Sequence, residues 1–212
     1  MSLVRLKRVL SEAALAELLS AMAKGKFSAT GANGPLELDA GPAYTTASGL
    51  LTAALQAHPQ FDAAAHPCAL QSPTFYRFEA GTAPESMHAP ALVGTSPTMR
   101  VDMAVLIPLG SSENDEGGEW LLDPDGVPTT WRGEAGDGLL HPASTAARFT
   151  PLTQGSCTVA IVLAQSRVSD SAQRRILFDM AKVLEQFAES GLTNEHVETV
   201  RRSYFNLLRR WT

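Results

Sequence analysis

The feature that most constrains the fold is a change of hydrophobic period near Thr74. From Thr74 to about Gln165 the helical spacing of apolar residues disappears, and short apolar runs alternate with turn signals. This pattern is typical of an all-β sandwich or jelly roll. The chain on either side has the helical period instead. The sequence therefore predicts an α+β fold in which N-terminal and C-terminal helices flank one β core.

Six short strands are predicted in the central stretch, and Asp125-Gly126 marks a hairpin turn between the third and the fourth. The polar segment 111–118 is predicted to be a loop. The predicted strands span residues 74–78, 103–108, 119–122, 129–132, 138–140 and 158–164.

The N-terminal part is predicted to supply two helices. Ser11 is expected to cap the first, which runs to about Lys24, and the second runs from about Thr46 to Ala57. Pro59 ends the second helix, because the residue before a proline is pushed out of the helical region. The Gly-, Ala- and Pro-rich segment 27–42 is predicted to be a loop with one short strand.

The C-terminal part has two strong helical patterns. Asp170 with Gln173 forms a capping-box-like start of a helix that ends near Gly191, and Thr193 is expected to cap the last helix. Both patterns carry an apolar stripe, which we expect to pack on the barrel or to support self-association. The stripes consist of Ile176, Leu177, Met180, Val183, Leu184 and Phe187, and of Val197, Val200, Tyr204, Leu207, Leu208 and Trp211.

Length and composition favour one domain. The chain has 212 residues, of which 44% are hydrophobic and 18% charged, enough for a single buried core. We expect a helical support in residues 1–72, a jelly-roll core in 73–166 and a helical pair in 167–212. The net charge of −5 gives no general attraction to nucleic acid or to an anionic membrane.

The cysteine count and the N-terminus indicate the compartment. Cys68 and Cys157 are too few for a disulfide framework, and their spacing matches no metal-binding pair. The first residues lack the apolar region and cleavage site of a signal peptide, and no stretch is long enough to span a membrane. We therefore expect a soluble cytoplasmic protein.

Two C-terminal blocks, residues 172–179 and 204–211, resemble the bacterial PKHD-type hydroxylases, which are iron(II)/2-oxoglutarate dioxygenases. The blocks are specific because their surface arginines match as well as their core positions. The resemblance extends upstream through 117–119, 100–102, 75–81 and 57–61, and covers roughly residues 45 to 212. It implies a double-stranded β-helix, or jelly roll, supported by helices.

The same resemblance implies an iron site that this chain has lost. Such enzymes hold iron with two histidines and a carboxylate, the first two as His-x-Asp on one strand. His88 matches the first histidine, but Pro90 stands at the aspartate position. The distal histidine falls on Ala147, and the arginine that binds 2-oxoglutarate falls on Cys157. A cysteine cannot reproduce the bidentate grip of a guanidinium on a carboxylate.

Neighbouring residues offer a limited replacement for the lost ligands. His141 is six residues from Ala147, up to about 20 Å along an extended chain. Glu85 lies an odd number of residues from His88 and would face the other way on a regular strand. Phe78 replaces a tyrosine that lines the family's cosubstrate pocket. The candidate pocket residues are Phe78, His88, Arg100, Asp102, His141 and Cys157.

Several of these residues also have a structural interpretation. Arg100, Asp102 and Glu119 are expected to join an ion-pair network rather than to line a pocket, and Cys157 is expected to be an inert core thiol. Trp120 and Trp131 are predicted to be core residues.

Two functional hypotheses follow. In the first, the chain is a divergent dioxygenase-like protein that lacks standard hydroxylase activity and binds a small molecule or a protein, as a homodimer or as the partner subunit of an active relative. In the second, it is an oxygenase with a rearranged metal site on His88 and His141, dependent on Fe(II) and 2-oxoglutarate.

Overall fold

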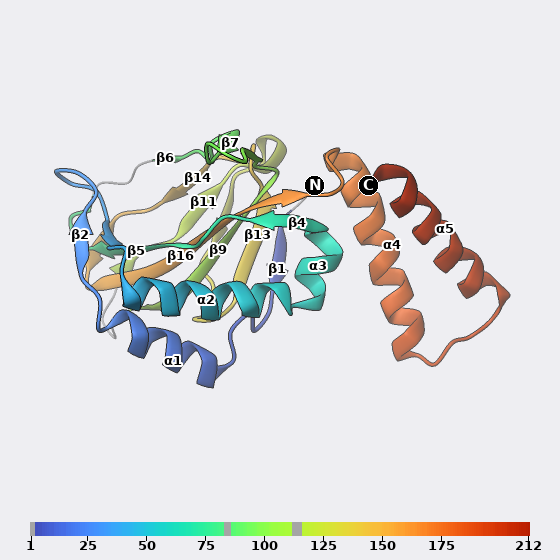
Figure 1. Ribbon diagram of the computed structural model, residues 1–212, viewed down its shortest axis with the longest axis horizontal. Helices are drawn as coiled ribbons and strands as arrows, with labels where there is room; N and C mark the ends of the chain where they lie inside the picture. Colours follow the sequence, from blue (N-terminus) through green and yellow to red (C-terminus); the bar gives the residue numbers. More distant parts are fainter. Residues whose placement is uncertain (1–2, 83–85, 112–115) are drawn as a thin grey trace.

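The computed structural model describes residues 3–82, 86–111 and 116–212. It shows a β barrel with helices against one face and a helical pair projecting from one end (Figure 1). The larger sheet has the order β1-β13-β9-β16-β5-β3-β2, with β4 also paired to β16. These strands are β1 (Val4–Leu6), β2 (Phe27–Ala29), β3 (Leu36–Leu38), β4 (Pro67–Leu70), β5 (Thr74–Glu79), β9 (Met103–Ser111), β13 (Gly138–Pro142) and β16 (Ser156–Ser166).

A smaller sheet has the order β12-β11-β14-β6, and two strand pairs complete the β structure. The 3-10 turn Pro124–Gly126 connects β11 to β12, at the predicted hairpin. The strands are β6 (Ser86–Met87), β11 (Trp120–Leu122), β12 (Thr129–Trp131) and β14 (Ala147–Phe149), with β10 (Glu116–Gly117) paired to β15 (Leu152–Gln154) and β7 (Leu92–Val93) to β8 (Met99–Arg100).

Side chains alternate between the two faces of the larger sheet and form two cores. On β16, Ala160 and Val162 join the helices in the first core, while Cys157 and Val159 join the second core inside the barrel. On β13, Leu140 belongs to the first core and Leu139 to the second. The strand pairing thus decides which residues reach the barrel interior.

Three helices cover the outer face of the larger sheet, and two form the C-terminal pair. The helices are α1 (Glu12–Met22), α2 (Pro42–Gln56), α3 (Pro59–Ala65), α4 (Ser171–Glu189) and α5 (Glu195–Trp211). The hydroxyl of Ser11 accepts a hydrogen bond from the Ala14 amide, and Asp170 accepts one from the Gln173 amide. Both predicted caps are therefore confirmed.

All six predicted strands are present, but the N-terminal part contains more structure than expected. It holds α3 and contributes β1 to β4 to the larger sheet, and segment 27–42 contains two strands rather than one. These strands have three or four residues, too few to show a period, and pairing stabilises them. In addition, β10 lies within the predicted loop 111–118, of which residues 112–115 lie outside the described residues.

Two helix starts also differ from the prediction. The second helix begins at Pro42, because proline is well suited to the first helical position. Asn194, not Thr193, caps α5, and its side-chain oxygen accepts a hydrogen bond from the Val197 amide at 3.0 Å.

The C-terminal pair contacts the rest of the chain through α4. Leu177, Phe178 and Arg174 are the buried residues of α4, and Phe178 joins the core beneath α1 to α3. Helix α5 packs along α4 and lies farther from the barrel (Figure 1). The apolar stripes thus contribute to packing between α4 and α5 and of α4 on α3, while Ile176 and Val183 of α4 remain exposed. In the described part of the chain, none of the helices combines the length and apolarity that a membrane crossing requires.

His66 ends α3 where α3 meets α4, in a left-handed conformation with φ of 44°. It is 7% exposed, and its Nε2 has no hydrogen-bond partner. Burial lowers the pKa of His66 below 6.5, as do the charges of Arg167 and Arg174, while Asp62 opposes the shift. A proton on this ring would therefore add an uncompensated buried charge.

We expect the free energy of unfolding to fall as the pH drops below about 6.5. Above that pH the ring is neutral in both states, whereas below it the unfolded chain takes up the proton first. Stability is then lost until the pH reaches the lower pKa of the folded state. The substitution His66→Asn should reduce the pH dependence of the free energy of unfolding between pH 5 and 7, as measured by urea denaturation. Asparagine is chosen because it tolerates the left-handed backbone at this position. His196→Asn, on the exposed surface of α5, is the control, and equal slopes in both variants would contradict the assignment.

Candidate functional site

The barrel contains a cavity of about 260 Å³ at the end where β5 begins and β16 ends. Its wall is the inner face of the larger sheet, with Ala147 of β14 and the segment around His88 also lining it. The lining residues are Gln71, Ser72, Thr74, Tyr76, His88, Ala89, Pro90, Val93, Ala104, Leu106, His141, Ala147, Ile161 and Leu163.

Strand alternation explains why these residues line the wall. Successive inward positions contribute two residues each from β5, β9 and β16 and one from β13. These are Thr74 and Tyr76, Ala104 and Leu106, Ile161 and Leu163, and His141. Because His141 follows the inward Leu139 by two residues, its ring faces the barrel interior.

His141 is the most constrained polar group of the cavity. It is 3% exposed, and its Nδ1 lies 2.9 Å from the carbonyl oxygen of Pro142. A carbonyl only accepts, so Nδ1 carries the hydrogen and Nε2 of the neutral ring is an acceptor. Burial lowers the pKa of His141, which favours this neutral form. Nε2 is buried and has no hydrogen-bond partner among the residues that the structure describes.

A second buried acceptor lies among the lining residues. The side-chain oxygen of Gln71 is buried and has no partner among the described residues. The backbone N–H of Gln71 donates a hydrogen bond to the backbone carbonyl of Leu163 at 2.9 Å. Burial raises the pKa of Tyr76, so its hydroxyl stays protonated. None of the described residues that line the cavity is an acid, a lysine or an arginine. The described lining is thus mainly apolar, with two acceptors that lack a described partner and no opposite charge for an ion.

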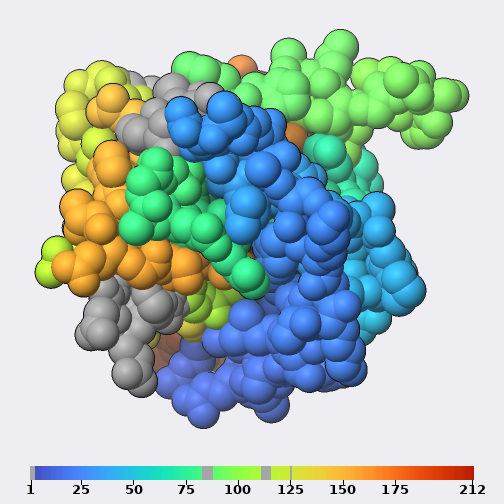
Figure 2. Space-filling view, turned by 90° about the vertical axis from the view of Figure 1, so that its left-hand side faces the viewer, coloured from blue at the N-terminus to red at the C-terminus, as the bar shows by residue number. Residues whose placement is uncertain are grey.

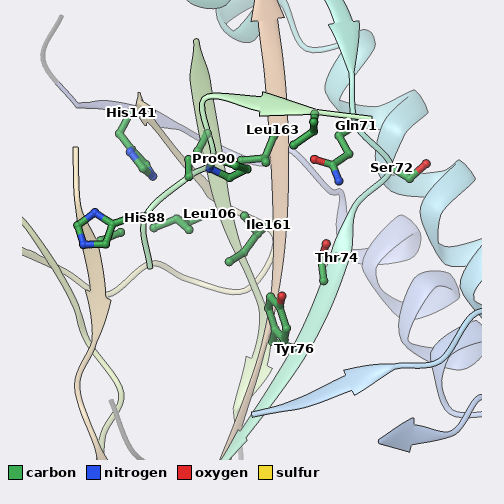
Figure 3. Close-up of a pocket in the computed structure, with 14 residues that line it drawn as sticks. Gln71, Ser72, Thr74, Tyr76, His88, Pro90, Leu106, His141, Ile161 and Leu163 are labelled. Atoms are coloured by element: carbon green, nitrogen blue, oxygen red, sulfur yellow. The ribbon is translucent and has the colours of Figure 1, made fainter. Parts of the chain in front are cut away.

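The two histidines predicted as candidates line the same cavity. Figure 3 shows the rings of His88 and His141 toward one side and Gln71, Thr74 and Tyr76 along the other. His88 is exposed, whereas His141 is buried. Pro90 and Ala147, which the sequence resemblance assigns to ligand positions together with His88, also line the cavity. Glu85, the nearby carboxylate, lies outside the described residues.

The other end of the barrel is filled by aromatic rings. The ring centroid of Phe78 lies 4.1 Å from that of Phe149 and 6.2 Å from that of Trp120, with Trp120 and Phe149 5.1 Å apart. Phe78 is paired with Cys157 in the β5–β16 register. All four residues are at most 9% exposed and belong to the inner core. The family's cosubstrate arginine position therefore lies in closely packed apolar surroundings.

A small cavity of about 70 Å³ lies beside this cluster, and Cys157 and Arg132 are among the residues that line it. This end of the barrel is where β5 ends and β16 begins, and Figure 2 views the molecule from the corresponding side. The segment after β5, in green, lies directly against β15 and the start of β16, in orange (Figure 2).

Arg100 and Asp102 lie outside the main cavity and form a structural ion pair. Arg100 Nε and Nη2 donate to the two carboxylate oxygens of Asp102 at 2.8 and 2.9 Å. The Ser166 amide also donates to Asp102, at 2.8 Å, and Arg100 donates to the Ser166 carbonyl. The pair thus fixes the end of β16 before α4, as the ion-pair interpretation of these two residues predicted.

The cavity of the candidate site therefore contains His88 and His141 and excludes Phe78, Arg100, Asp102 and Cys157. Sequence reasoning missed Gln71, Thr74 and Tyr76. Only the inward alternation of β5 could have indicated the last two, and nothing in the sequence marks Gln71.

The residues of the cavity do not fit an iron–2-oxoglutarate centre. Within residues 3–82, 86–111 and 116–212, no three His, Cys, Asp or Glu side chains are grouped to hold a metal ion. The main cavity has no cationic lining residue for the dianion, and aromatic side chains occupy the region of the arginine position.

Comparison of folds finds barrels of the same kind in solved 2-oxoglutarate–iron(II) oxygenases. It superposes on a prolyl hydroxylase from Trichoplax adhaerens with a TM-score of 0.58 at 12% identity, covering 82% of this chain and 86% of that one. A 2OG-Fe(II) oxygenase family protein from Burkholderia pseudomallei gives 0.55 at 16% identity, covering 76% and 82%. These likenesses establish the jelly-roll fold predicted from the sequence.

Curated relatives identify the family. A PKHD-type hydroxylase of Shewanella baltica is 31% identical over 160 residues, which cover 74% of this chain and 71% of the relative. One from Synechococcus is 34% identical over 164 residues, covering 76% and 73%. No family model matches the chain. The chain belongs to the PKHD-type hydroxylase family.

Placing the family's arginine in the aromatic cluster should destabilise the fold. We expect Cys157→Arg to lower the free energy of unfolding by about 2–4 kcal/mol, because it buries a cation among apolar groups. Cys68→Arg, at the chain's exposed cysteine, is the matched control and should change stability by less than about 0.5 kcal/mol. Urea denaturation measures both. Equal stability of the two variants would mean that this region can still accommodate the arginine.

Proposed function

We propose that this chain is a PKHD-type protein without standard hydroxylase activity, whose barrel serves as a binding site for a small molecule. It keeps the family's jelly roll but does not form the family's iron and 2-oxoglutarate sites. The barrel interior is divided into an open half, around His141, and a closed half, around Phe78.

The observation that carries the proposal is the aromatic packing at the cosubstrate end. Loss of a ligand alone would leave a vacant site that a nearby residue could fill. Here Phe78, Trp120 and Phe149 fill the space against Cys157, with centroid distances from 4.1 to 6.2 Å. The rings leave a cavity of only about 70 Å³ beside Cys157 and Arg132, less than half of the roughly 150 Å³ that holds a benzene molecule.

Metal and cosubstrate binding test the proposal directly. Protein purified without chelator should contain far less than one equivalent of iron by plasma emission analysis. Calorimetry should detect no 2-oxoglutarate binding with Ni²⁺ present, because the lining supplies neither a third metal ligand nor a cation. HygX of Streptomyces hygroscopicus, solved with nickel and 2-oxoglutarate bound, is the positive control. Near-stoichiometric iron together with micromolar 2-oxoglutarate affinity would overturn the proposal.

A rearranged oxygenase site is the second candidate, since His88 and His141 line one cavity. Two imidazoles leave iron short of the third ligand that such centres use. We expect His88→Ala to leave metal content and 2-oxoglutarate-dependent oxygen uptake unchanged, equal to those of the control His196→Ala. A drop in either quantity that is specific to His88→Ala would favour the rearranged site instead.

A further inference from the structure

The open half of the barrel contains a cavity lined by His141, whose Nε2 is a buried hydrogen-bond acceptor without a partner among the described residues. Nε2 of His141 faces the interior on a strand held by β1 and β9, and its tautomer is set by Nδ1 bonding to the Pro142 carbonyl. Leaving a buried acceptor without a donor is costly, so an N–H or O–H group placed at this point would stabilise the structure. The unpartnered oxygen of Gln71 offers a second acceptor.

The size and lining of the cavity restrict what can supply that donor. Its 260 Å³ exceeds the roughly 150 Å³ of an apolar cavity that holds benzene. Strands β9 and β16 line the cavity with apolar side chains, namely Ala104, Leu106, Ile161 and Leu163. A charged ligand would meet no opposite charge among the described residues that line the cavity, since none of them is an acid, a lysine or an arginine.

We propose that the cavity binds an uncharged, mainly apolar molecule of one or two rings, whose hydroxyl or ring N–H donates a hydrogen bond to Nε2 of His141. His88, exposed at the mouth, lies where it can contact the polar edge of such a ligand. This inference rests on the proposed function, because an iron–2-oxoglutarate centre would use the same space.

Three probes with the same ring system distinguish how a hydrogen-bond donor, the ring alone and a negative charge affect the binding affinity. Metal-free full-length protein is titrated with 2-naphthol, naphthalene and 2-naphthoate, and binding is followed by probe fluorescence. We expect 2-naphthol to bind about 10-fold more tightly than naphthalene, because only the naphthol satisfies Nε2. The 2-naphthoate anion should bind at least 10-fold more weakly than naphthalene.

Variants test whether the preference for 2-naphthol depends on His141. His141→Leu should abolish the preference for 2-naphthol while still binding naphthalene, and His196→Leu, on α5, should retain the wild-type order. Ala104→Leu, which adds side-chain volume at the inner wall, should weaken binding of both neutral probes at least 10-fold. Thermal unfolding of each variant confirms that it is folded.

The outcomes separate this inference from the proposed function. Equal affinities for 2-naphthol and naphthalene, or an unchanged preference in folded His141→Leu, would overturn the ligand assignment even if iron and 2-oxoglutarate fail to bind. Tight binding of iron and 2-oxoglutarate would instead overturn the proposed function itself.

Discussion

The pairing of β16 with β5 and β9 is the constraint on which the rest of the structure depends. Because the side-chain period of a strand is two, this register sends Ala160 and Val162 toward the helices and Cys157, Val159 and Ile161 toward the barrel. A shift by one residue would exchange the two sets and remove both cores. The helix-facing core is the larger of the two, so the barrel wall is held in place from outside.

The inner face has changed in two different ways along its length. At the end where β16 begins, Phe78, Trp120 and Phe149 close the interior against Cys157. At the other end the substitutions reduce polarity but leave space, since Pro90 and Ala147 line a cavity rather than a packed core. The replaced positions 78, 90, 147 and 157 are thus physically linked. Under the proposed function, the aromatic rings occupy the space that a charged cosubstrate bound at position 157 would need.

The sequence predicted most of the fold because its strands and helices carry readable periods. The six predicted strands, the Ser11 and Asp170 caps and the jelly-roll class were recovered. The short strands β1 to β4, β6 to β8, β10, β14 and β15 were not predicted, since strands of two to four residues acquire their conformation from pairing. The candidate site was predicted less well. Arg100 and Asp102, two of the candidate pocket residues, form a local ion pair at the end of β16 instead. Gln71 lines the cavity, but no motif in the surrounding sequence indicates this. His141 was identified as a candidate, but its tautomer and its unpartnered Nε2 depend on tertiary contacts that no spacing encodes.

The contrast between the two ends also bears on whether the cavity has a use. An open cavity costs stability because its apolar lining stays in contact with water, so stability alone favours filling it. The cosubstrate end was filled in this manner, by rings that contact one another closely. The His141 end was not, although larger side chains at Ala104 or Ala147 would occupy the space. It also keeps a buried imidazole whose acceptor nitrogen has no partner, a second unfavourable feature at the same place. A ligand that fills the apolar volume and donates to Nε2 would remove both costs together, whereas loss of the old chemistry explains neither.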